Sequence, residues 1–180
     1  MSRRTLIGLI VPLVLVAAYF GVTAYVRAHV DGLIEGSVGE PLPAFELVDL
    51  GGRTWSKDRL AGKRLVLHFF RSRCHSCDVE AEEIRALEQD LPDDVVLLHV
   101  MTDQVLEFDP EWTKATIANK RFTRPILMAD AAFMDAFHTV SWSNVTPITY
   151  VVDASGVVRF GLRGAQTEAS IEAALEAAKA

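Results

Sequence analysis

Cys74 and Cys77 are the two cysteines of the 180-residue chain, and two residues separate them. They lie between an apolar run at 65–70, typical of a buried strand, and a segment from Val79 with apolar residues at helical spacing. The first turn of a helix has unpaired N–H groups and the positive end of the helix dipole. A thiolate there is stabilised, so Cys74 is predicted to be the nucleophile. Cys77, about one turn away, can close a small disulfide ring, and the pair can cycle between dithiol and disulfide.

Residues around Cys74 add positive charge or hydrogen-bond donors: Arg71, Arg73 and His75. Two neighbouring thiols could instead be half of a zinc site. Such a site needs a second close pair of ligands, and the remaining histidines are scattered along the chain, at His29, His68, His99 and His138. The cysteine spacing therefore favours redox chemistry over a structural metal.

The N-terminal part has no charged residue between Leu6 and Val26, which is about the length that crosses a bilayer. Arg3 and Arg4 predict a cytoplasmic N-terminus at 1–5 by the positive-inside rule. A cleaved signal peptide is the alternative, but the run is long for its apolar core and ends in no clear cleavage site. We therefore expect an uncleaved anchor at 6–26, a polar linker at 27–37 and a domain at 38–180 in an oxidising, extracytoplasmic compartment.

Composition limits the class of protein further. Half of the residues are hydrophobic, which is enough for a sizeable core, and the length suits one domain with an appendage. The net charge of −6 argues against nucleic acid as a partner.

The domain alternates short strand and helix patterns. Strands are expected at 45–50, 53–56, 65–70, 95–101, 125–128, 148–152 and 157–162. Helices are expected after the cysteines, at 110–119 and 130–138, and from Thr167. Asp153 to Gly156 reads as a hairpin turn between the last two strands. Trp112 and Phe133 are expected in the core.

This order of segments resembles the thioredoxin superfamily, and specifically its membrane-anchored TlpA/ResA-like branch. The resemblance covers 38–164, and its matching segments are 38–45, 60–63, 69–77, 145–147 and 152–156. It implies an α/β, thioredoxin-like fold: a central mixed sheet flanked by helices, here with an N-terminal transmembrane helix.

The resemblance also assigns a role to the Thr146-Pro147 pair, which from the residues alone would be an ordinary turn. Pro147 is expected to be cis and to pack on the disulfide, which leaves the backbone of Thr146 open to an extended partner. Trp142, shortly before, could line the same groove or simply pack within its loop.

Departures from the family pattern point to residues that tune the site. The family usually has Trp before the first cysteine and often Pro before the second, whereas this chain has Arg73 and Ser76. Together with His75, these residues are expected to set the redox potential.

Two further positions are candidate proton carriers for the dithiol. Glu80 matches a glutamate of this branch, and His68 takes the place of a buried aspartate in thioredoxin. The alternatives are a solvated glutamate and a hydrogen-bonded core histidine.

The resemblance implies a thiol–disulfide oxidoreductase of the inner membrane, single-pass, with its domain in the periplasm or its equivalent. It would reduce disulfides of exported proteins, such as the haem-site cysteines of apocytochromes c, with electrons from a membrane thiol protein and without metal or organic cofactor. One alternative is Sco-like copper delivery, with His138 as the histidine to watch. The other is a peroxiredoxin-like peroxidase, disfavoured because 70–74 lacks the Pro-x-x-x-Thr-x-x-Cys pattern.

Overall fold

The computed structural model describes residues 3–137 and 142–179, and the chain divides into two units, 1–33 and 34–180. Helix α1 (Arg3–Ser37) contains a stretch, Ile10–Ser37, that is long and apolar enough to cross a membrane by length and composition. The residues predicted as a linker, 27–37, are helical. They hold two glycines, which a helix tolerates at a cost of about 1 kcal/mol each, and no proline.

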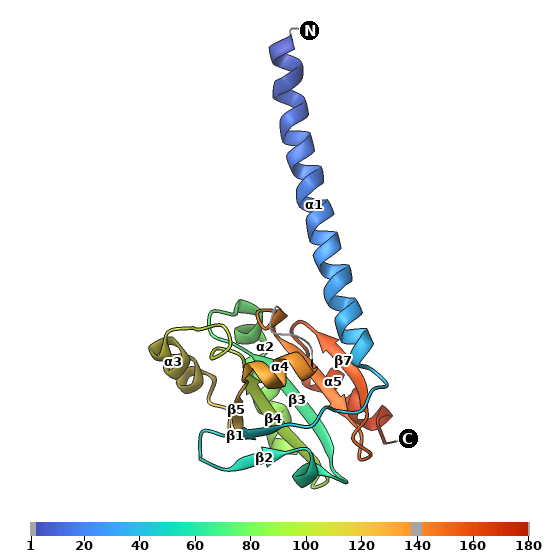
Figure 1. Cartoon of the computed structure of the whole chain (residues 1–180), viewed down its shortest axis with the longest axis vertical. Helices are drawn as coiled ribbons and strands as arrows, with labels where there is room; N and C mark the ends of the chain where they lie inside the picture. Colours follow the sequence, from blue (N-terminus) through green and yellow to red (C-terminus); the bar gives the residue numbers. More distant parts are fainter. Residues whose placement is uncertain (1–2, 138–141, 180) are drawn as a thin grey trace. The chain divides into compact units, whose positions relative to one another are not determined.

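The centre of the second unit is a five-stranded sheet in the order β5-β4-β3-β6-β7 (Figure 1). The middle strand β3 (Arg64–Phe70) pairs in parallel with β4 (Val95–Met101), which pairs in parallel with β5 (Ile126–Met128). On its other side, β3 pairs antiparallel with β6 (Ile148–Val152), which pairs antiparallel with β7 (Val158–Arg163). The predicted mixed sheet is confirmed.

The strands form where apolar residues run without interruption. All residues of β3 and β6 are buried, which suits strands covered on both faces. The hairpin predicted between β6 and β7 is present: the Asp153 carboxylate accepts from the N–H groups of Ser155 and Val157, and Gly156 takes a left-handed φ of 82°. A second, two-stranded sheet contains β1 (Glu46–Val48) and β2 (Thr54–Ser56).

The helices cover both faces of the central sheet. Helices α2 (His75–Asp90) and α5 (Glu168–Ala177) pack on Val66 and its neighbours. On the opposite face, Phe133 of α4 (Ala131–Phe137) stacks on Phe69 of β3. The alternation of β3 side chains therefore sends Val66, His68 and Phe70 toward α2.

One prediction about the core is wrong. Trp112 was expected in the core but is 45% exposed, because α3 (Pro110–Lys120) presents it to solvent; Phe133 is buried as predicted. Helix α2 begins directly after its N-cap Cys74, which agrees with the prediction that the cysteines lie at the start of a helix. His138 lies outside the described residues. A single-turn 3₁₀ helix, η1 (Asp58–Leu60), precedes β3.

Candidate active site

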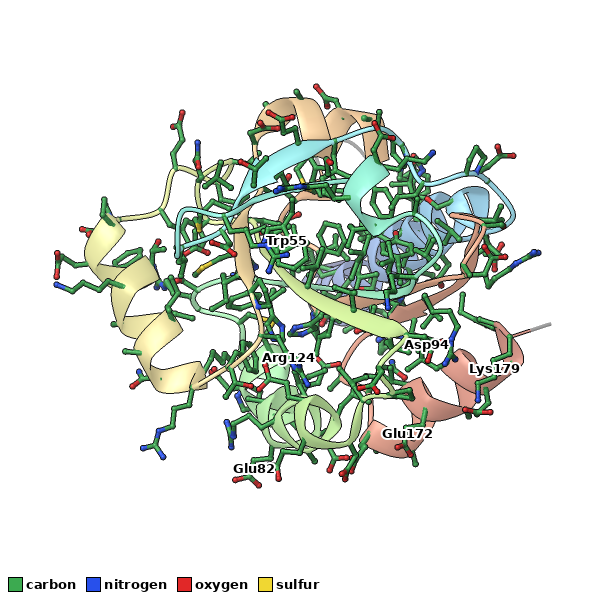
Figure 2. The ribbon with its side chains drawn as sticks, turned by 90° about the horizontal axis from the view of Figure 1, so that it is seen from below. Trp55, Glu82, Asp94, Arg124, Glu172 and Lys179 are labelled. Atoms are coloured by element: carbon green, nitrogen blue, oxygen red, sulfur yellow. A yellow bond between two sulfur atoms is a disulfide. The ribbon has the colours of Figure 1, made fainter. Side chains whose placement is uncertain are left out.

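The two cysteines form a disulfide at the start of α2, with Cα atoms 5.2 Å apart (yellow bond in Figure 2). Cys74 is the N-cap, and its Sγ accepts a hydrogen bond from the Cys77 backbone N–H at 3.2 Å. Both side chains are nearly buried. The helix N-terminus therefore directs an unpaired N–H group at the sulfur of Cys74, as the spacing predicted.

The segment that delivers Cys74 is held by Asp103, which the sequence analysis did not single out. The backbone N–H of Ser72 donates to Asp103 Oδ1 at 2.7 Å, and the Ser72 hydroxyl also bonds this carboxylate. Thr113 of α3 donates to Asp103 Oδ2 at 2.7 Å. Arg73, between Ser72 and Cys74, has a left-handed φ of 55°. Asp103 thus fixes the turn between β3 and α2 and connects it to α3.

Thr146 and Pro147 lie beside Cys74, although they are distant in sequence. The peptide bond between them is cis, as expected. The Thr146 hydroxyl donates to Cys74 Sγ at 3.4 Å, and the Thr146 carbonyl oxygen lies 3.6 Å from the same sulfur. Trp142 is half-buried, and its carbonyl accepts from the N–H of Val145. Its predicted place in a partner groove stays a prediction.

The three predicted tuning residues, Arg73, His75 and Ser76, are all exposed. The Arg73 guanidinium carbon lies 4.6 Å from the ring centroid of Trp112, a cation–π arrangement. This pair places a positive charge and an exposed aromatic surface next to the disulfide.

A buried lysine also contacts the cysteine helix. Lys120 is 3% exposed, and its ammonium donates to the Cys77 carbonyl oxygen and, at 2.7 Å, to Asp78 Oδ1. Nothing in the sequence distinguishes this residue, because a lysine at the end of a polar helix looks like an ordinary solvated residue.

His68 and Glu80 lie in contact under α2, with His68 Nε2 3.2 Å from Glu80 Oε2. Each is 1% exposed, so the alternative of a solvated Glu80 is wrong. The other oxygen of Glu80 accepts from the N–H of Gln166 at 3.0 Å. His68 Nδ1 lies 3.0 Å from Nδ1 of His99, a residue that sequence analysis gave no role.

His99 in turn contacts Glu88, with 2.8 Å between Nε2 and Oε1. Burial lowers the pKa of His99 to about 4. Burial opposes ionisation of Glu88, but the His99 N–H and the backbone N–H groups of Arg124 and Thr123 outweigh it and lower the pKa to about 2. At neutral pH, His99 is therefore neutral and Glu88 is a carboxylate. One signal in the sequence could have indicated this contact: His68 and His99 are each a single histidine inside an apolar strand pattern.

Comparisons with known proteins agree with this geometry. A sequence model of the AhpC/TSA family matches residues 38–160. The thioredoxin-like protein YneN of Bacillus subtilis (strain 168) is 23% identical over 176 residues, 98% of this chain and 99% of the relative. The thiol-disulfide oxidoreductase YkuV of the same organism is 27% identical over 125 residues, 67% of this chain and 81% of the relative.

Among solved structures, a thiol:disulfide interchange protein of the thioredoxin family from Chlorobium tepidum TLS superposes with a TM-score of 0.63 at 20% identity, over 78% of this chain and 96% of that one. This likeness establishes the thioredoxin-like fold. The predicted resemblance to TlpA/ResA-like members of the thioredoxin superfamily is thus confirmed at the level of family and fold. With the family match spanning more than half of its length, the chain belongs to the AhpC/TSA family and, within it, has the fold and cysteine pair of a thioredoxin-like protein.

Proposed function

We propose that this thioredoxin-like oxidoreductase reduces disulfides of exported proteins, with Cys74 as nucleophile and Cys77 as resolving cysteine. The observation that carries the proposal is the position of Cys74 Sγ at the N-cap of α2. The Cys77 N–H and the Thr146 hydroxyl both point at this sulfur. Two donors and the helix dipole stabilise negative charge there, which favours a thiolate at neutral pH.

The reaction moves two electrons from the dithiol to the substrate. The Cys74 thiolate attacks one sulfur of the substrate disulfide, and the other substrate sulfur leaves and takes up a proton. Cys77 then loses its proton and attacks Cys74 Sγ, which releases the second substrate thiol. The protein is left with the Cys74–Cys77 disulfide, the state of this structure.

Substrate would bind along Thr146 and Pro147. An extended segment can pair with the open backbone of Thr146, which places its disulfide beside Cys74. Trp142 would border this groove, and exposed Arg73, His75 and Ser76 would adjust the thiolate and contact the partner. Glu80, one helical turn from Cys77, and His68, its hydrogen-bond partner on β3, would accept the proton that Cys77 loses.

The helix α1 supports a single-pass anchor in the cytoplasmic membrane. Arg3 and Arg4 favour a cytoplasmic N-terminus, so the domain would face the periplasm or its equivalent. A membrane thiol protein would then return the disulfide to the dithiol, and apocytochrome c haem-site cysteines are suitable substrates.

A single round of disulfide reduction tests this proposal. The full chain in detergent micelles is reduced, freed of reductant and mixed with a peptide whose Cys-x-x-Cys-His motif is oxidised. We expect one disulfide reduced per protein, no reduction by Cys74→Ser, and covalent peptide adducts with Cys77→Ser. Equal reduction by Cys74→Ser and wild type contradicts the proposal.

A peroxidase is the second candidate, because the matching family model is that of AhpC/TSA proteins. Consumption of hydrogen peroxide by the reduced full chain decides between the two. With excess dithiothreitol as electron donor, a rate no higher than that of dithiothreitol alone agrees with disulfide reduction, and faster consumption at substoichiometric protein identifies a peroxidase. For copper delivery, the expected ligand His138 lies outside the described residues, and titration of the reduced chain with copper(I) tests it.

A further inference from the structure

Four buried side chains form a continuous line under α2, which we call the buried chain: Glu80, His68, His99 and Glu88. The register of β3 and β4 pairs His68 with His99, so both rings project from one face of the sheet. Helix α2 lies over this face and carries both glutamates (Figure 1). The three contacts along the line measure 3.2, 3.0 and 2.8 Å, and each side chain is at most 3% exposed.

The direction of the hydrogen bonds is set at the Glu88 end. The Glu88 carboxylate accepts from the N–H and hydroxyl of Thr123 and from the N–H of Arg124. These are all donors, so Glu88 can only accept from His99, and the proton of His99 lies on Nε2. His99 is neutral, and its Nδ1 therefore carries no proton and acts as an acceptor.

Because each hydrogen bond needs one donor and one acceptor, the state of His99 also determines which nitrogen of His68 carries a proton. His68 Nδ1 faces the bare Nδ1 of His99 and must carry a proton for the 3.0 Å contact to be a hydrogen bond. At the other end of the ring, one proton lies between His68 Nε2 and Glu80 Oε2. The N–H of Gln166 donates to Glu80 Oε1, so both oxygens of Glu80 have a partner.

The side chains around His68 and His99 are compatible with these proton positions. The charged groups that act on them are Glu80 and Glu88 from α2 and Arg124 from the segment before β5. Their other close neighbours are aromatic: Phe122 stacks on His99 at 4.1 Å between centroids, and Phe70 stacks on His68 at 5.7 Å.

We propose that Glu88 and His99 are positioning residues, which hold His68 with a proton on Nδ1 and thereby keep the His68–Glu80 pair electrically neutral beside Cys77. The proposal rests on the function proposed above and adds two residues to it. Residues three apart on a helix are neighbours, so Glu80 lies one turn beyond Cys77. A neutral pair there accepts a nearby thiolate at less cost than a lone carboxylate does.

In the resolving step, the S–H bond of Cys77 breaks and an O–H bond forms at Glu80, while the proton between His68 Nε2 and Glu80 Oε2 stays on Nε2. The Cys77 sulfur then attacks Cys74 Sγ and expels the substrate thiolate. The proton passes from Glu80 to water. Electrons move only between the sulfurs, so the step needs no further reactant.

Two substitutions of His99 separate positioning from packing. A glutamine can donate its NH₂ to Glu88 and accept from His68 with its oxygen, so His99→Gln preserves the bond direction. His99→Leu fills similar space and preserves neither bond. Because leucine offers no acceptor to His68 Nδ1, the His68–Glu80 pair can lose one proton in His99→Leu. The carboxylate of Glu80 then places a net negative charge beside Cys77.

The readout is the resolving step itself. Reduced full chain in micelles is mixed with an aromatic disulfide that releases two coloured thiolates, the first on attack by Cys74 and the second on attack by Cys77. The pH midpoint of the second phase should be equal in wild type and His99→Gln. In His99→Leu it should rise by about one unit, which slows the phase about tenfold near neutral pH. Equal shifts in both variants, or no shift in folded His99→Leu, overturn the proposal.

A second measurement needs no turnover. Nitrogen NMR of the oxidised full chain, labelled in its histidine rings and assigned with His68→Gln and His99→Gln, should show a proton on His68 Nδ1 and none on His99 Nδ1 at pH 7. A proton on His99 Nδ1 refutes the positioning role even if the enzyme is active. The expected pattern in a chain without disulfide exchange refutes the proposed function instead.

Discussion

Charged residues at helix α2 lie in two contrasting settings. Beside its N-terminus, at a surface that we call the rim, Arg73 is exposed, and water and salt can reach it. Beneath the helix, Glu80 and Glu88 are buried and every oxygen has a partner from the protein. Exposed charges are screened and contribute little each, whereas a buried charge that loses its partner is costly. A substitution at the rim should therefore change the free energy of unfolding less than a substitution in the buried chain.

Removal of a buried glutamate gives the largest expected effect. Glu88→Ala leaves donors of His99, Thr123 and Arg124 without an acceptor, and we expect the free energy of unfolding to fall by about 3–5 kcal/mol. Urea denaturation of the full chain in micelles measures this change.

Glu82 provides the matched control on the same helix. Its side chain is 87% exposed and points away from the protein in Figure 2, with a 3.5 Å contact to Arg85. Glu82→Ala should therefore change the unfolding free energy by less than about 1 kcal/mol. Similar losses in the two variants would remove the contrast between exposed and buried charges on α2.

The pH dependence of stability sharpens the contrast further. The pKa of His99 falls from 6.5 to about 4 in the fold because of burial. The unfolded state thus binds more protons as pH falls from about 6.5 to about 4, and stability falls with it, by up to about 3 kcal/mol. Glu88, whose pKa falls from 4.5 to about 2, extends the loss to lower pH in the same direction.

Urea midpoints of the full chain at pH 7.5, 5.5 and 4 test this expectation. His99→Gln has no titrating group at this position and should flatten the loss between pH 6.5 and 4. An unchanged pH profile in His99→Gln would show that another group causes the acid sensitivity.

Thr146 is half-buried, so its hydroxyl is intermediate between the exposed and the buried charges. Thr146→Val removes its hydrogen bond to Cys74 Sγ and should raise the pKa of the reduced Cys74 thiol. We expect alkylation of the full chain by iodoacetamide at pH 6 to slow about tenfold, since a hydrogen bond to a charged group contributes about 1.5 kcal/mol or more. A rate equal to that of wild type would exclude a role of the hydroxyl.

The smallest effect is expected at the rim. Arg73→Ala removes the charge that stacks on Trp112 and should slow reaction of Cys74 with an anionic disulfide about two- to threefold at low salt. Arg53 is the control, because it stacks on Trp55 at 4.5 Å in the separate two-stranded sheet. Arg53→Ala should leave the rate unchanged, and 0.5 M salt should abolish the effect of Arg73→Ala.

Local pattern was sufficient to predict much of the fold. The apolar runs predicted β4 and β6 with the bounds observed, and Cys74, Pro147 and the Asp153 turn lie where the family resemblance implied. The glycines and charges of the segment 27–37 predict a linker, yet the segment lacks the proline that would end a helix. Residue type alone predicts Trp112 in the core, although α3 has no continuous apolar stripe.

The buried chain was only half predictable. His68 and Glu80 stood out because they occupy positions with family counterparts. Their continuation to His99 and Glu88 depends on the register between β3 and β4, which one strand does not reveal. The same holds for Asp103 and Lys120, whose partners come from distant elements.

The central claim is that Cys74 attacks and Cys77 resolves, and trapping of mixed disulfides in membranes tests it most directly. Full chains with Cys77→Ser or Cys74→Ser are recovered from membranes after thiol alkylation, and their disulfide adducts are identified by mass spectrometry. We predict abundant adducts of exported proteins through Cys74 in Cys77→Ser and few in Cys74→Ser. Abundant adducts through Cys77 in Cys74→Ser, with few in Cys77→Ser, would contradict it.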